Sequence, residues 1–81
     1  MDAGEILDLM NLVVTKRGLP AISDMALSTR DAKFRSLDFS EVALRIEDKI
    51  GRELSFDAAE MRRIVTVKDV VDFFTEASRA A

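Results

Sequence analysis

The chain of 81 residues has no cysteine, histidine, tryptophan or tyrosine, and it has only three glycines and one proline. Without cysteine no disulfide can form, and without cysteine or histidine the usual zinc ligands are missing. The lack of histidine also excludes a Ser-His-Asp hydrolase. No apolar run approaches the roughly 18 residues that a membrane helix needs, and the N-terminus lacks the pattern of a secretion signal. We therefore expect a cytoplasmic protein held together by packing alone.

The composition is that of a folded domain with a mild acidic excess. Hydrophobic residues make up 48% of the chain and charged residues 33%, and the net charge is −3. This apolar content argues against disorder, and the length predicts a single domain over residues 1–81. Proteins that bind nucleic acids usually show a basic patch, so the acidic balance disfavours such a partner. We expect a monomer.

Capping signals divide the chain into helical segments. Asp2 with Glu5 and Asp57 with Glu60 have the spacing of residues that cap the start of a helix. Gly18 is a natural helix stop. Ser36 opens a third segment and Thr66 can cap a fourth. Helices are therefore expected over about residues 3–16, from 36 to 51 or a little further, over 58–63, and from 67 onward.

Apolar spacing supports this division into helices. The β-branched run 64–67 could instead form a strand, but no second strand signal exists to pair with it. Residues 17–35 show no sustained period and predict a long loop pinned to the core by apolar side chains. The expected fold class is all-α, a small bundle of three main helices plus one short helix. Buried stripes at helical spacing are Phe39, Val42, Ala43, Ile46 and Ile50, followed by Val67, Val70, Val71 and Phe74.

A serine opens the second of these segments, in the stretch Phe34-Arg35-Ser36-Leu37-Asp38. The stretch from Ile64 to Phe74 contains the start of the last segment, at the pair Thr66-Val67. In this order, an apolar helix, a long loop, a Ser-led helix, a short helix and a final helix, the chain resembles acyl carrier proteins over nearly its whole length.

The resemblance implies a modification site and a function. Ser36 matches the serine that carries 4′-phosphopantetheine, a flexible arm whose thiol holds acyl, aminoacyl or polyketide groups as thioesters. The unpaired N–H groups at a helix start favour an anion such as the phosphodiester of this arm. The chain would then be a stand-alone carrier and not an enzyme. Its partners would be a phosphopantetheinyl transferase, using coenzyme A and Mg²⁺, and acyl-activating, acyl-transfer or condensing enzymes.

One residue departs from the family pattern, because Arg35 precedes the serine where the family normally has aspartate. With Arg45 and Arg52 at the edge of the same helix face, this favours a carrier of a specialised pathway over the housekeeping fatty-acid carrier. The resemblance also implies a partner-binding surface on the outward face of the Ser-led helix. Besides Arg35, its residues are Leu37, Glu41, Leu44, Glu47 and Asp48.

Simpler interpretations of the same residues stay open. Ser36 could serve only as the N-cap of its helix, as most serines before helices do. Leu37 could pack under the long loop and Leu44 could be a tolerated surface residue. The main rival function is an unmodified helical protein-interaction module that binds through Leu37 and Leu44. No cluster of carboxylates predicts a metal site.

Overall fold

Four helices are present in the computed structural model, which describes residues 1–79. They are α1 (Ala3–Lys16), α2 (Ser36–Ile50), α3 (Ala58–Arg62) and α4 (Val67–Arg79), and no strand occurs in these residues. The predicted all-α fold, with a long loop between its first two helices, is confirmed. The far end of α2 was expected at residue 51 or later. The helix stops at Ile50 because Gly51 adopts a left-handed φ of 73° and its N–H bonds to the Glu47 carbonyl at 2.9 Å.

The helix starts follow the predicted capping chemistry. The Asp2 carboxylate accepts a hydrogen bond from the Glu5 N–H at 2.9 Å, and the Glu5 carboxylate accepts one from the Asp2 N–H at 3.1 Å. The Asp57 side chain accepts a hydrogen bond from the Glu60 N–H at the start of α3. These bonds satisfy backbone donors that the first helical turn leaves unpaired.

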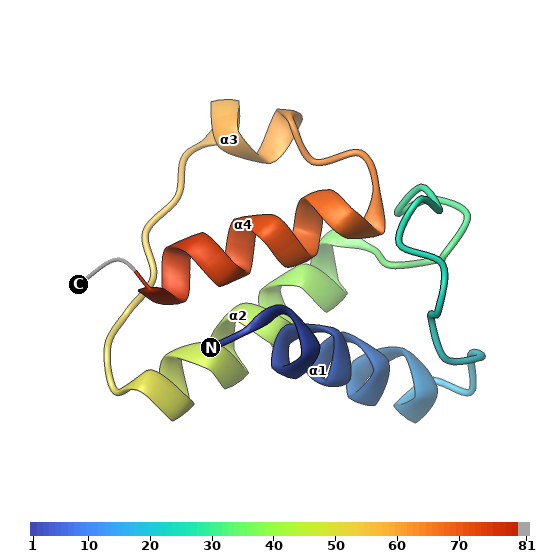
Figure 1. Cartoon of the computed structure of the whole chain (residues 1–81), viewed down its shortest axis with the longest axis horizontal. Coiled ribbons are helices and arrows are strands. Elements are labelled where there is room, and N and C mark those ends of the chain that lie inside the picture. Colours follow the sequence, from blue (N-terminus) through green and yellow to red (C-terminus); the bar gives the residue numbers. More distant parts are fainter. Residues whose placement is uncertain (80–81) are drawn as a thin grey trace.

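The core lies where the three long helices meet. Helix α1 packs against both α2 and α4, and α3 lies outside α4 at the edge of the molecule (Figure 1). Both predicted apolar stripes face inward, although Ile50 is only partly buried. Helix α3 has no buried residue of its own. Fully buried side chains are Ile6, Met10, Val14, Val42, Ile46, Val67, Val70, Val71 and Phe74.

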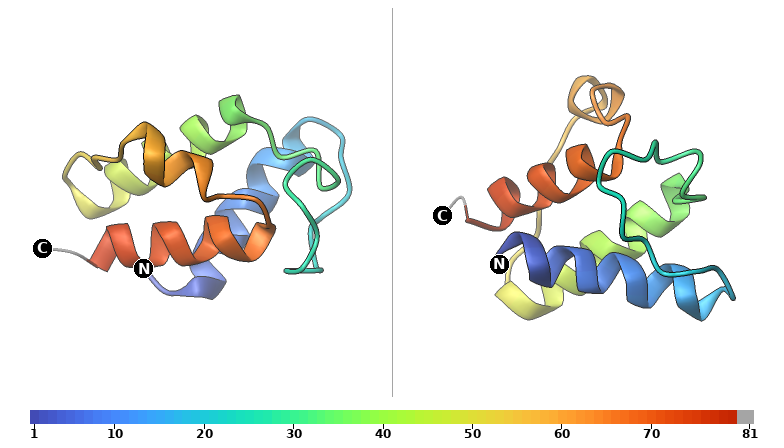
Figure 2. Two further views of the ribbon diagram at one scale, coloured as in Figure 1. Left: turned by 90° about the horizontal axis from the view of Figure 1, so that it is seen from above. Right: turned by 45° about the vertical axis from the view of Figure 1, so that its right-hand side comes forward.

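The long loop 17–35 is tied to the core and to the chain just before α4. Ile22 is buried, and its backbone N–H and carbonyl both bond to the Asn11 side chain, at 2.6 and 3.1 Å. An isolated antiparallel bridge joins Ser28 to Thr66, and the Thr29 N–H donates to the Val65 carbonyl at 2.9 Å. The loop therefore closes the end of the bundle at which α2 and α4 begin (Figures 1 and 2).

Candidate functional site

Ser36 is exposed and is the first residue of α2. The residue in the N-cap position is Arg35, in an extended conformation, and the Ser36 hydroxyl makes no hydrogen bond within residues 1–79. The alternative that Ser36 acts only as a helix cap is therefore wrong. A hydroxyl without a partner at a helix start is accessible for modification.

The capping role belongs to Asp38, whose side chain is only 3% exposed. Its Oδ2 accepts hydrogen bonds from the Arg35 N–H at 2.8 Å and from Arg17 Nη2 at 2.6 Å. Arg17 also donates to the Lys33 carbonyl at 2.7 Å, which ties the end of α1 to the loop before α2. The sequence analysis did not identify this carboxylate as a cap. The available signal was its position three residues after the N-cap, the spacing already noted at the other helix starts.

Four cationic side chains surround Ser36 in a hollow of about 580 Å³. We call it the cationic hollow, and no carboxylate is among its lining residues. All four cations belong to the loop 17–35, which brings Arg17 beside the other three. The lining residues are Arg17, Thr29, Arg30, Lys33, Phe34, Arg35 and Ser36.

A smaller, mostly apolar crevice of about 110 Å³ opens beside Ser36 toward the core. Phe39 forms part of its wall, and this ring packs against Phe74 with centroids 4.6 Å apart and against Phe56 at 5.5 Å. Ser36 thus lies between a cationic surface and an apolar opening. The other lining residues of the crevice are Thr29, Phe34, Arg35, Met61, Ile64 and Val70.

The outward face of α2 carries two exposed leucines. Leu37 is 71% exposed and Leu44 is 66% exposed, so Leu37 does not pack under the loop. Asp48 is also exposed. The geometry agrees with the predicted helix phase and leaves both leucines available to a partner.

Two of the carboxylates expected on this face already have partners in the chain. Glu41 Oε2 lies 3.1 Å from Arg45 Nη2, and Glu47 Oε2 accepts a hydrogen bond from the Leu54 N–H at 2.7 Å. Arg52 donates to the Ala77 carbonyl at 3.2 Å, at the far end of α4. Arg45 therefore offsets the charge of Glu41, whereas Glu47 keeps its charge but is held toward the chain after the helix.

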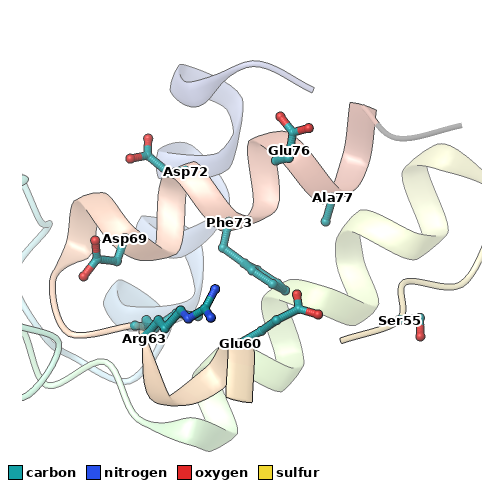
Figure 3. Close-up of a pocket in the computed structure, with 9 residues that line it drawn as sticks. Ser55, Glu60, Arg63, Asp69, Asp72, Phe73, Glu76 and Ala77 are labelled. Atoms are coloured by element: carbon teal, nitrogen blue, oxygen red, sulfur yellow. The ribbon is translucent and has the colours of Figure 1, made fainter. Parts of the chain in front are cut away.

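A second open cleft, of about 460 Å³, lies between α3 and α4. Phe73 points from α4 toward α3, with Glu60 and Arg63 on the facing side (Figure 3). Asp69 and Asp72 also line the cleft, but Asp72 pairs with Lys68 at 2.6 Å. Across residues 1–79, no group of three or more carboxylates could hold a metal ion.

Within residues 1–79, no base forms a hydrogen bond with the Ser36 hydroxyl. Asp38, the nearby carboxylate, is held by Arg17 and by the Arg35 N–H and is not placed to accept the hydroxyl proton. The chain has no histidine to act as a base. Within the described helices, none is long and apolar enough to cross a membrane.

Comparison with protein-family models, with curated proteins and with solved structures finds no match to this chain.

Proposed function

We propose that this chain is a carrier protein of the acyl-carrier type, modified on Ser36 with 4′-phosphopantetheine. The observation that carries the proposal is the exposed, unpartnered Ser36 hydroxyl at the first position of α2. Its surroundings suit a phosphodiester, because the helix start and the cations of the hollow both favour negative charge. The thiol of the bound arm would hold an acyl group as a thioester.

The chain would supply the acceptor oxygen and leave the rest of the reaction to a transferase. Ser36 Oγ would form the new P–O bond, the pyrophosphate bond of coenzyme A would break, and adenosine 3′,5′-bisphosphate would leave. Because no group near Ser36 can take the hydroxyl proton, the proton would pass to a base on the transferase. The enzyme would also supply the Mg²⁺ site.

The proposal is tested by the mass of the intact protein after incubation with coenzyme A, Mg²⁺ and a broad-specificity phosphopantetheinyl transferase. Wild type should gain one phosphopantetheine arm, and Ser36→Ala should gain none. The matched control is Ser40→Ala, because Ser40 is also exposed on α2 one turn further along. It should be modified like wild type.

Ser36→Ala should remain folded, because the Ser36 hydroxyl makes no bond that its loss would break. Modification of Ser40 or another serine would contradict the assignment of the site. No modification by any transferase tried would reject the carrier function.

A second function is favoured by one specific observation, the exposure of Leu37 and Leu44 on a single helix face. An unmodified interaction module would bind a partner protein through these leucines and would not need Ser36. In that case Ser36→Ala would retain full partner binding. A carrier with the same substitution would lose every reaction that depends on the arm.

A further inference from the structure

The surroundings of Ser36 are positively charged, although the whole chain has a net charge of −3. Asp38 compensates part of this charge, because its carboxylate lies 2.6 Å from Arg17 and 3.6 Å from Arg35. Arg30 and Lys33 are exposed and have no carboxylate within 4.0 Å in the described part of the chain. Asp31, an exposed carboxylate between them in the sequence, offsets part of their charge. The loop and helix start around Ser36 still keep a positive excess, because four cations stand against two carboxylates, Asp31 and Asp38.

The acidic side chains of α2 do not restore a negative surface near this site. Glu41 is shared between Arg45 at 3.1 Å and Lys16 at 3.9 Å. Glu47 is turned toward the chain that follows the helix, where it accepts the Leu54 N–H. The surface that an approaching protein meets around Ser36 is consequently cationic.

We propose that enzymes acting on Ser36 dock against the cationic hollow through an acidic surface. This inference rests on the proposed function, because it concerns the enzymes that the carrier would meet. Ser36 is itself part of the lining, so any protein that reaches its hydroxyl approaches Arg30, Lys33 and Arg35. The Debye screening length is about 8 Å at physiological ionic strength. An acidic protein surface within that distance of the hollow would be attracted, and a basic one would be repelled.

The arrangement fits an extended protein surface better than a small phosphate ligand. Arg17 already donates to the Asp38 carboxylate and to the Lys33 carbonyl. The remaining cations are spread along an open rim that belongs to the loop and the helix start. Exposed Leu37, next to Ser36, would add an apolar contact that a partner protein could use and a phosphate ion could not.

Matched charge reversals test the proposal through kcat/KM for modification of Ser36, using the transferase that modifies wild type fastest. Arg30→Glu/Lys33→Glu should lower kcat/KM roughly tenfold or more at low salt. At about 0.5 M salt the loss of kcat/KM relative to wild type should be much smaller than at low salt, because screening removes the long-range attraction. The control, Lys49→Glu/Arg79→Glu, makes the same change in net charge at exposed positions near the other ends of α2 and α4.

The control variant should keep its kcat/KM within about twofold of wild type, and both variants should keep the helical circular dichroism of wild type. Equal losses in the two variants would show that only net charge matters, and no loss in either would show that the hollow is not used. Both results overturn the proposal. A faster reaction of Arg30→Glu/Lys33→Glu would mean that the enzyme presents a basic surface, which also overturns it.

Direct binding gives a test that does not depend on modification. If no transferase modifies the protein, the proposed function fails, and the surface is then probed with a Glu- and Leu-rich helical peptide. Amide shifts at residues 29–37 that Arg30→Glu/Lys33→Glu abolishes would support an acidic protein partner. The absence of such shifts would overturn the proposal of an acidic docking partner. Stronger shifts of the same residues with inorganic phosphate than with the peptide would also overturn it, in favour of a small-anion site.

Discussion

Only Leu37 separates Ser36 from Asp38, yet the Ser36 side chain is open to solvent and the Asp38 side chain is almost completely buried. Their positions at the start of α2 explain the difference. The Ser36 side chain is exposed to solvent. The Asp38 carboxylate instead accepts hydrogen bonds from the Arg35 N–H and from Arg17, which lies 21 residues earlier. Within residues 1–79 the Ser36 hydroxyl makes no hydrogen bond, whereas the Asp38 carboxylate ties the start of α2 to Arg17.

The first prediction compares two ion pairs of unequal burial. Arg17→Gln removes the closer of the two cations beside the buried Asp38, leaving only Arg35 at 3.6 Å, and should lower the free energy of unfolding by about 2 kcal/mol. This cost is smaller than the cost of removing one partner of a fully buried ion pair, because the Arg17 side chain is 29% exposed. Arg45→Gln removes the surface pair with Glu41 and should cost less than about 0.5 kcal/mol. Urea unfolding of both variants measures the difference. Equal costs would mean that Asp38 is not held by Arg17.

The contact between Arg17 and Asp38 lay beyond what the sequence could predict. Arg17 follows the predicted end of α1, in a stretch with no helical or strand period, and the path of the loop determines where it points. Arg30 and Lys33 belong to the same loop, so their grouping around Ser36 also could not be predicted. The serine itself and the outward leucines were predictable, because helical geometry alone places them.

Among the elements, the start of α4 is the best secured. Asp69 Oδ2 accepts hydrogen bonds from the Thr66 N–H at 3.0 Å and the Val65 N–H at 2.9 Å, and Thr66 Oγ1 accepts one from the Asp69 N–H. These same residues pair with the loop through the Ser28–Thr66 bridge and the bond from the Thr29 N–H to the Val65 carbonyl. The cap therefore fixes α4 and, through the loop, the residues that surround Ser36.

The second prediction concerns the pH dependence of this cap. The Thr66 N–H, and next the Val65 N–H, favour the ionised carboxylate and lower the pKa of Asp69. Its pKa in the folded chain is then below the unfolded value of about 3.9, so the stabilisation is present above pH 4. It is lost as the pH falls through the folded pKa. Asp69→Asn should therefore be less stable than wild type at pH 7, and the gap should close below pH 4.

Urea unfolding at a series of pH values measures this gap. The control is Asp48→Asn, because Asp48 is exposed and accepts no hydrogen bond within residues 1–79. Its stability should run parallel to that of wild type. A gap for Asp69→Asn that persists unchanged at pH 3 would show that the charge of the carboxylate is not what the cap uses. Asp69→Ala should cost about 1 kcal/mol at neutral pH.

The helices could be predicted from the sequence because their determinants are local. Asp2, Asp57 and Thr66 cap helices within three or four residues of themselves, and Gly51 ends α2 by its own backbone conformation. The bridge between Ser28 and Thr66 was not predictable, since it joins a loop without period to the start of a helix. The rejected strand at 64–67 is indeed absent, although one of its residues pairs across this bridge.

At the scale of the whole molecule, the candidate functional residues lie on the side of α2 that faces away from the core. Ser36 and the cationic hollow are at the start of the helix, and Leu37 and Leu44 extend outward along it. Helices α1 and α4 cover the inward side with the core. A partner could therefore contact the serine, the cations and both leucines without disturbing the packing of the bundle.

The last prediction separates binding from folding on this face. Leu44→Asp should change the free energy of unfolding by less than about 0.5 kcal/mol, because Leu44 is 66% exposed. It should lower kcat/KM for modification of Ser36, or the affinity for a cognate enzyme, by roughly tenfold, equivalent to about 1.4 kcal/mol of lost contact.

Thermal unfolding and the modification rate measure the two effects. Leu12→Asp introduces the same charge at an exposed leucine of α1, outside α2 and outside the lining of the hollow, and should leave the rate unchanged. A destabilised Leu44→Asp would mean that this leucine packs in the fold. An unchanged rate in both Leu37→Asp and Leu44→Asp would exclude the outward face of α2 from partner binding.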